Sequence, residues 1–381
     1  MPHNHAGIVS DPSLPARVAS SSATPLRRSV LGAGLALLAP WSTQAETPQR
    51  GWTDFRRRFL TQDGRVVDTG NQGVSHSEGQ GYGMMLAAAF DTQTTFQTMM
   101  EWTERSLGRR EDRLLAWRWR PDAPNQDRSD RNNAADGDLL VAWGLCRAAV
   151  RWHNRDYLAR AKAMATDFLR YNTVEVGGHL LMRPGTTGFD HGEHLVVNPS
   201  YAVFPAMREL DALQPDPRWR RLEAGMLDLL GHAQFGRRQL TADWVEVPRA
   251  GGRYRIASEW PARFSWDAVR IPLYMAWAGL ASDPALDPLM AVWFDPARGA
   301  APPAWWDLRG ESPAPYEATP GIVAIARLLL SARLGREQGH ALVLPSVAEA
   351  ADYYNAALIM LCRLAANEGS MNIALVEAAS T

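Results

Sequence analysis

Apolar residues recur every three or four positions along most of the chain, which is the spacing of one face of an α-helix. In the segment 136–150, Leu139, Trp143 and Cys146 follow this spacing, so one stripe of that helix is predicted to be buried. The same period marks residues 165–172, 321–335 and 348–367. Helices are expected to begin near Trp52, Ser77, Thr95, Asp136, Tyr157, Ser200, Trp219, Asp267, Leu286, Gly321 and Val347.

Strand-like segments are few and short. Residues 179–184 and 253–258 alternate in the way that small hairpins do. Three long polar and aromatic loops, at 120–134, 184–199 and 295–320, interrupt the helices. Long loops on a compact scaffold tend to carry function. The pattern therefore predicts a helical body with functional loops at its surface.

No change in composition divides the chain after its N-terminal segment. Ten or more helices in one domain can form a bundle, a solenoid or a closed α/α barrel. The sequence has no repeat of 34 or 40 residues, which argues against a regular solenoid. Periodicity alone does not separate the other two arrangements.

The N-terminal segment looks like an export signal. Arg27 and Arg28 precede an apolar run from Val30 to Ala39, and Thr43-Gln44-Ala45 has the form of a cleavage site. The arginine pair and the long polar leader favour the twin-arginine route. We expect residues 1–45 to be a cleaved signal peptide, residues 46–381 to be one catalytic domain, and the protein to be secreted or periplasmic. An uncleaved anchor is the alternative.

Charge and composition narrow the class of ligand. The net charge is −1, and it becomes about −3 without the leader, which carries three arginines and one aspartate. Nothing here favours nucleic acid or an anionic membrane surface as a partner. The chain has 15 tryptophans, and tryptophan-rich clefts suit flat ligands such as sugar rings, although large helical proteins also bury Trp in their cores.

Two cysteines, Cys146 and Cys362, lie in apolar helical patterns, so buried thiols are expected rather than a functional pair. A disulfide between them has no support in the sequence. The chain has no CxxC, phosphate-binding loop, dinucleotide fingerprint or G-x-S-x-G turn. Residues 190–194, DHGEH, match none of the helical zinc spacings. We therefore expect neither a metal nor an organic cofactor.

The stretch HSEGQGYGMM, residues 76–85, raises the first candidate. Each helical glycine costs about 1 kcal/mol relative to alanine, yet glycines surround Glu78. Ser77 is expected to cap the helix, and Glu78 would then stabilise its first turn. Gly79 and Gly83 share a face without side chains, so a neighbouring helix or a ligand must approach there.

Two aspartates also stand at helix starts. Asp136 is expected to cap the helix that follows it, with Asp138 in the first turn. A calcium loop is disfavoured because further oxygen ligands and a terminal glutamate are missing. Asp267 opens another segment, with Arg270 three residues later, which could be a surface ion pair. Each acid has a purely structural explanation when taken alone.

Taken together, three acids at helix starts among aromatic residues of an exported protein suggest chemistry on a neutral polymer that stacks on aromatic rings. Glycoside hydrolysis has this requirement: one carboxylic acid protonates the leaving oxygen while a carboxylate activates water or attacks the sugar.

The blocks SEGQGYGMM, NAADGDLLVAW, NPSYAVFPA and WDAVRIPLY, in this order, resemble glycoside hydrolase family 8, and AWRWRP (116–121) and ADWVEV (242–247) match too. The similarity runs from about Trp52 to the 330s. It implies an (α/α)6 barrel, an all-α fold, whose helix starts line an open cleft. It also implies inverting endo-hydrolysis of β-1,4-glucan, as in the cellulases encoded with bacterial cellulose synthase.

The resemblance also implies roles for individual residues. Glu78 matches the general acid, Asp267 the general base, and Asp136 the residue that binds and distorts the −1 sugar. Tyr201 and Arg270 match residues that hold that sugar and the attacking water. Tyr82 is expected to form part of the cleft wall, and Trp117 and Trp143 are expected to be stacking platforms. An acid must keep its proton, so we expect burial and a nearby carboxylate such as Asp136 to outweigh the helix dipole at Glu78.

Other readings stay open at this stage. The same fold could act on xylan or chitosan, or the chain could be a non-catalytic glucan-binding export factor. Retention of all three acids argues against the last. The resemblance to enzymes encoded with cellulose synthase also points to the synthase complex as a candidate partner.

Overall fold

The computed structural model describes residues 46–124, 129–298, 302–335 and 342–368. The expected signal peptide, residues 1–45, lies outside these residues and stays a prediction. The described chain is mostly helical, with short antiparallel strands in its connecting segments, as the hydrophobic pattern predicted.

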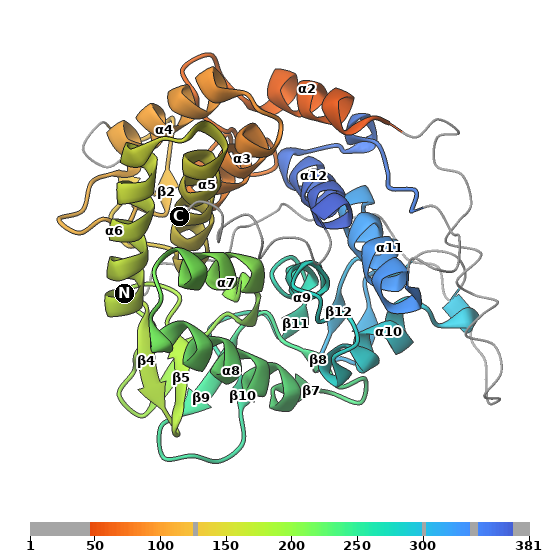
Figure 1. The fold of residues 1–381 in the computed structure, drawn as a ribbon. Helices are drawn as coiled ribbons and strands as arrows, with labels where there is room; N and C mark the ends of the chain where they lie inside the picture. The colour runs from red at the N-terminus through yellow and green to blue at the C-terminus, as the bar shows by residue number, and fades with distance from the viewer. Residues whose placement is uncertain (1–45, 125–128, 299–301, 336–341, 369–381) are drawn as a thin grey trace.

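Six helices form an inner ring, in which each contacts the next and the last returns to the first (Figure 1). They are α3 (Ser77–Ala89), α5 (Ala135–Trp152), α7 (Phe204–Leu213), α9 (Ile271–Trp277), α11 (Pro320–Leu334) and α12 (Tyr353–Glu368). The helices outside this ring are α2 (Pro48–Phe59), α4 (Gln93–Leu107), α6 (Arg155–Tyr171), α8 (Pro217–His232) and α10 (Asp287–Trp293). The arrangement is an (α/α)6 barrel.

The two layers differ in their burial. Nearly every residue of α3 and most of α5 are buried, because these helices have neighbours on all sides. In α8, by contrast, the buried residues Trp219, Leu222, Met226 and Leu229 follow one helical stripe. Amphipathic outer helices thus cover an apolar inner ring, and the core lies between the layers.

Glycines set the distance between α3 and α5. A Cβ atom at Gly81 would lie 2.5 Å from Leu140 Cβ, and one at Gly137 would lie 2.0 Å from Ser77 Oγ. Gly79 faces Tyr353 of α12, whose hydroxyl oxygen would be 2.8 Å from an added Cβ. The bare face of α3 therefore admits neighbouring protein elements, which answers the question that the sequence left open.

Short strands pair in the segments between helices. β4 pairs with β5 and β9 pairs with β10, so the hairpins expected at 179–184 and 253–258 are confirmed. The strands are β1 (Ser75–His76), β2 (Arg118–Trp119), β3 (Ser129–Asp130), β4 (Thr173–Val176), β5 (His179–Met182), β6 (His194–Val197), β7 (Gln234–Phe235), β8 (Leu240–Thr241), β9 (Val245–Pro248), β10 (Arg255–Ile256), β11 (Arg263–Phe264), β12 (Trp306–Asp307) and β13 (Ser312–Pro313). The single 3₁₀ turns are η2 (Pro199–Tyr201), η3 (Ala268–Arg270), η4 (Pro284–Leu286), η5 (Pro296–Arg298) and η7 (Val347–Glu349).

Two predicted helix caps are wrong. The N-cap of α3 is His76, and the buried hydroxyl of Ser77, inside the helix, has no hydrogen-bond partner among the residues that the structure describes. The N-cap of α5 is Ala134, so Asp136 lies within the first turn. Both helices begin one or two residues earlier than the predicted caps. The pairing of β1 with β2 fixes the backbone before α3, and the hydrogen bond from Ala135 N to Pro184 O fixes the backbone at the start of α5.

Cys146 and Cys362 are both buried free thiols, as predicted. Burial raises the pKa of each thiol, to about 12 at Cys146, which keeps that group unreactive. Over the described part of the chain, every helix is too short or too polar to cross a bilayer.

Candidate active site

The starts of α3 and α5 and the segment before α9 meet at an open cleft of about 520 Å³. Glu78, Asp136 and Asp267 all line it, together with Tyr201 and Arg270. Residues far apart in the sequence are thus brought to one site, as the resemblance implied. Aromatic rings form much of the remaining wall, contributed by Trp117, Trp266, Trp305, Tyr316, Tyr353 and Tyr354.

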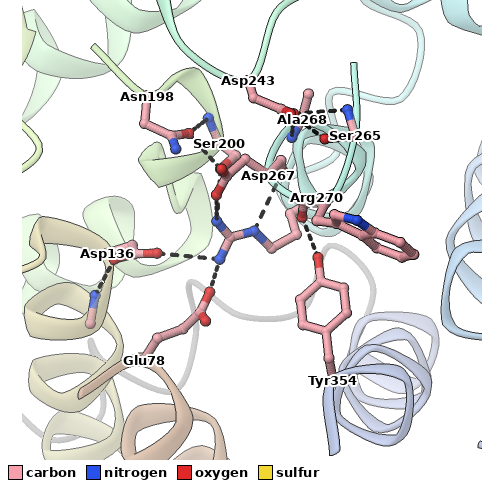
Figure 2. Close-up of polar contacts among 12 residues, drawn as sticks. Glu78, Asp136, Asn198, Ser200, Asp243, Ser265, Asp267, Ala268, Arg270 and Tyr354 are labelled. Atoms are coloured by element: carbon pink, nitrogen blue, oxygen red, sulfur yellow. Dashed lines mark hydrogen bonds and ion pairs between the residues drawn. The ribbon is translucent and has the colours of Figure 1, made fainter. Parts of the chain in front are cut away.

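Arg270 lies at the centre of the site (Figure 2). Its Nη1 contacts Glu78 Oε1 and lies 3.3 Å from Asp136 Oδ2. Its Nη2 lies 2.8 Å from Asp267 Oδ1 and donates to Ser200 Oγ at 3.0 Å. A guanidinium has five donors in a fixed plane, so a single arginine can hold three carboxylates in one geometry. The ion pair between Asp267 and Arg270 exists, but Arg270 is buried rather than at the surface.

Glu78 projects from the first turn of α3, with 18% of its side chain exposed. The Tyr82 hydroxyl donates to Glu78 Oε1 at 2.9 Å and lies 2.7 Å from the Tyr274 hydroxyl. Asp136 lies near Glu78, since both acids reach the same Nη1 of Arg270, so the guanidinium contacts the two acids at once. Tyr82 is fully buried, so it orients Glu78 from behind and does not form the cleft wall.

Asp136 is buried at the start of α5, and its Oδ1 accepts a hydrogen bond from Gly137 N at 2.8 Å. Gly137 explains why this residue lies so near Glu78. An added Cβ there would lie 2.7 Å from Glu78 N, so only glycine lets the two helix starts meet. Burial, with the charges of Asp267 and Asp138, raises the pKa of Asp136 to about 8.

Asp267 precedes η3 and keeps 31% of its side chain exposed toward the cleft. Burial of the carboxyl group and the charge of Asp243 raise the pKa of Asp267 to about 7. The carbonyl of the preceding residue, Trp266, accepts a hydrogen bond from the Tyr354 hydroxyl of α12 (Figure 2). The segment is thus held from α12 as well as from Arg270.

Tyr201 ends η2, and its ring lies 5.8 Å from the Arg270 guanidinium carbon. The turn is capped by Asn198, whose Oδ1 accepts from Ser200 N and Ser200 Oγ. Trp244 packs edge-on against the Tyr201 ring at 5.9 Å. Tyr201 therefore has a fixed orientation at the cleft wall.

The two tryptophans named as platforms have different positions. Trp117 lines the cleft, stacked at 5.7 Å on the His76 ring with the Arg118 guanidinium over it. Trp143 is fully buried, packed on Trp277 at 4.9 Å. The expectation that Trp143 stacks on substrate is wrong, because its helical stripe faces the barrel core.

Sequence reasoning missed several residues of this site. Trp305 and Tyr316 line the cleft from the loop 295–320, where the sequence indicated function but singled out no residue, and Tyr354 lines it from α12. Asp68 and Asp352 also line the cleft. They are far apart along the chain, so the sequence did not indicate that they share a site. Asp243 was visible only as the first of the two acids in ADWVEV, and an acid inside such an apolar run indicates a buried carboxylate.

The acid- and histidine-rich segment 190–194 has structural partners. Asp190 pairs with Arg249 at 2.6 Å, and His191 stacks on His194 at 4.9 Å. Within the residues that the structure describes, no three potential metal-binding side chains of the His, Cys, Asp and Glu types converge.

Comparisons with known proteins agree with this geometry. The sequence profile described as Glycosyl hydrolases family 8 matches residues 28–368. The chain belongs to glycosyl hydrolase family 8.

A protein named "Probable endoglucanase" from Novacetimonas hansenii is 39% identical over 321 residues, 83% of this chain and 90% of that relative. An endoglucanase from Cellulomonas uda is 37% identical over 290 residues, 76% of this chain and 80% of that relative. The solved structure of the endo-beta-1,4-glucanase CMCax from Acetobacter xylinum superposes with a TM-score of 0.78 at 39% identity, covering 84% of this chain and 98% of that chain. This family 8 enzyme is thus a glycoside hydrolase with the (α/α)6 barrel fold.

Proposed function

We propose that the protein is an inverting endo-β-1,4-glucanase that cleaves internal bonds of cellulose or a soluble derivative of it. The observation that carries this proposal is the placement of Glu78 and Asp267 on different nitrogens of the Arg270 guanidinium, inside a cleft with aromatic walls. The similarity to endoglucanases supports the choice of glucan as the substrate.

In the proposed reaction Glu78 donates its proton to the glycosidic oxygen as the bond to C1 breaks. Asp267 takes a proton from a water molecule that attacks C1 from the opposite face, so the anomeric configuration inverts. Inverting enzymes keep their two carboxyls about 6.5–9.5 Å apart to hold that water. The width of a guanidinium between Glu78 and Asp267 is consistent with such a separation. The pKa of Asp267, about 7, suits a base that works near neutral pH.

The other residues of the site would act on the sugar in the −1 subsite. Asp136 and Tyr201 would hold its hydroxyls, and Arg270 would fix both the sugar and the attacking water. Trp117 would stack on a neighbouring glucose unit. The chemistry needs neither a metal nor an organic cofactor, because proton transfer by two carboxyls suffices.

The biological setting is part of the same proposal. The leader supports export to the periplasm or the medium, and the resemblance to enzymes encoded with cellulose synthase supports a role in trimming nascent glucan. Association with the synthase complex would follow from that role.

Release of reducing ends from carboxymethylcellulose tests the function. Wild type is expected to release them, whereas Glu78→Gln and Asp267→Asn are each expected to lose about a thousandfold or more of kcat while binding cello-oligosaccharide. Proton NMR of the first product should show the α-anomer. A β-anomer would refute inversion, and equal turnover by wild type and Glu78→Gln would refute the acid.

The same assay separates the alternative substrates. Activity on xylan or chitosan without activity on carboxymethylcellulose would change the proposed substrate to that polymer and would leave the proposed reaction unchanged. Binding of glucan by wild type without turnover of any of these polymers would favour the non-catalytic export factor.

A further inference from the structure

Asp243 is a buried carboxylate that the proposed reaction does not use. It lies between β8 and β9, is 6% exposed, and does not line the cleft. Its backbone N–H donates to Arg263 O at 2.8 Å, which fixes it beside the end of β11. The residue therefore touches the segment that carries Asp267 but has no access to substrate.

The Asp243 carboxylate accepts three hydrogen bonds from that segment. Oδ1 accepts from Ser265 N and from Ala268 N, both at 2.8 Å, and Oδ2 accepts from Ser265 Oγ (Figure 2). The two donor residues flank Trp266 and Asp267. A single side chain thus ties down both ends of the short segment that presents Asp267 to the cleft.

Charge gives Asp243 a second influence on Asp267. Its negative charge, together with burial, favours the protonated form of Asp267, whose pKa is raised to about 7. Burial raises the pKa of Asp243 itself to about 6, whereas the hydrogen bonds from Ser265 and Ala268 and the Arg263 guanidinium favour its charged form. Asp243 therefore makes Asp267 hold a proton more strongly than burial alone would.

Other groups also face Asp267, from several elements. They are Arg270 from η3, Asp136 from α5, Tyr201 from η2, Tyr354 from α12, and the polar side chains of Asn198 and Trp244. Arg270 already pairs with Asp267, and Asp136 shares that guanidinium. Asp243 differs from these groups, because it combines a negative charge with hydrogen bonds to the backbone of the segment that carries Asp267.

We propose that Asp243 is a positioning residue for the water-activating carboxylate: it holds the Ser265–Ala268 segment in place and strengthens Asp267 as a proton acceptor by its charge. This inference rests on the proposed role of Asp267 as the base.

The test is the pH profile of kcat/KM and kcat on carboxymethylcellulose for wild type, Asp243→Asn and Asp243→Glu. Asparagine keeps an oxygen that accepts from the two backbone donors but removes the charge. We expect its acidic limb to move to lower pH by about one unit and its plateau kcat to fall about tenfold, because a weaker base transfers the proton less well. Glutamate keeps the charge but displaces the segment, so kcat is expected to fall about tenfold or more with the acidic limb unmoved.

Ser265→Ala is the matched control, because it removes one hydrogen bond to Asp243 and keeps both charges. We expect a loss of kcat of a few fold without a shift of the limb. An Asp243→Asn profile whose acidic limb coincides with that of wild type would overturn the inference. If Asp243→Asn does not fold, as judged by circular dichroism, wild-type kcat in both Ser265→Ala and Asp243→Glu would overturn it instead.

The two proposals fail in different ways. Turnover by Asp267→Asn would show that Asp267 is not the base, and the inference about Asp243 would then fail as well. An inactive Asp267→Asn together with an unshifted Asp243→Asn profile would leave the proposed function intact and reject only the role of Asp243.

Discussion

The two halves of the site are held in place by different means. Glu78 and Asp136 stand in the first turns of α3 and α5, two long helices packed through glycines, with Gly137 at the point where they meet. Asp267 stands in an irregular segment before a 3₁₀ turn, where side chains of Asp243, Tyr354 and Arg270 supply the bonds. The half that carries the proposed acid (the acid half) is built by backbone packing, and the half that carries the proposed base (the base half) by side-chain hydrogen bonds and charge.

Because of this difference, the two halves are expected to tolerate different kinds of substitution. A helix start fixed by backbone contact resists changes of charge but not of volume, because a close-packed interface has no room for an extra methyl group. A segment fixed by buried polar bonds tolerates small changes of volume but not the loss of a partner, which leaves a buried group unsatisfied. Arg270 joins the halves, and so belongs to both.

Arg270→Lys is expected to have the largest effect, because an ammonium cannot hold three carboxylates in one plane. We expect kcat to fall by about a thousandfold, with a smaller change in KM, since the acid and the base both lose their fixed positions. Steady-state kinetics on carboxymethylcellulose measure this. A loss of less than tenfold would show that the two halves keep their geometry independently.

Substitution of Trp143 and of Trp117 by alanine tests that the first ring lies in the core and the second in the cleft. Trp143→Ala is expected to lower the free energy of unfolding by about 3–5 kcal/mol, because the ring is fully buried. Trp117→Ala is expected to raise KM for cello-oligosaccharides about tenfold through a lost stacking contact. Urea unfolding and kinetics of both variants decide the matter. A raised KM with unchanged stability in Trp143→Ala would contradict the placement of that residue.

Gly137→Ala tests the packing of the acid half. The added Cβ would lie 2.0 Å from Ser77 Oγ, so the helix starts must separate, at a cost of about 2–3 kcal/mol in stability and with reduced kcat. Gly231→Ala in α8 is the matched control, because no atom of the described part of the chain lies within 4 Å of its added Cβ. There alanine is expected to raise stability by up to about 1 kcal/mol. Equal effects of the two changes in urea unfolding would refute the close contact.

The buried Asp138 of α5 gives the smallest expected effect. It accepts hydrogen bonds from Leu115 N and Asn133 Nδ2, and burial raises its pKa to about 7. The native state therefore holds a proton between pH 4 and 7 that the unfolded chain releases. Its contribution to stability is present in full at acidic pH and is lost as the pH rises from about 4 to 7.

Urea unfolding of wild type and Asp138→Asn at pH 5, 6 and 7 measures this contribution. The asparagine variant has no proton to lose, so its free energy of unfolding should fall less over this range. Parallel curves for the two proteins would show that Asp138 does not titrate there.

Much of the fold could be predicted from the sequence. The helical period placed the inner helices near their observed starts, for instance at Ser77 and near Asp136, because burial of an apolar stripe is a local pattern. The caps at Ser77 and Asp136 were wrong, since the entry into each helix is fixed by strand pairing and loop contacts from elsewhere in the chain.

Motifs identified the carboxylates of the site, but they did not predict which side chains contact each carboxylate. The sequence placed Glu78, Asp136 and Asp267 at or near helix starts, and the motif order indicated glycoside hydrolase chemistry. One guanidinium contacts all three, although Arg270 lies 192 residues from Glu78 and 134 residues from Asp136, and Asp243 supports Asp267 from 24 residues away. Tyr82 is only four residues from Glu78, but its burial behind that acid depends on packing against other segments.

The helical class, the candidate acids and the family resemblance are encoded in local spacing or in short blocks of residues, so the chain alone indicates them. The tryptophan that faces the cleft, the occupant of the bare face of α3 and the groups around each carboxylate became known from the three-dimensional structure. Those outcomes depend on packing between distant segments, where a single glycine, such as Gly137, sets how closely two helix starts approach.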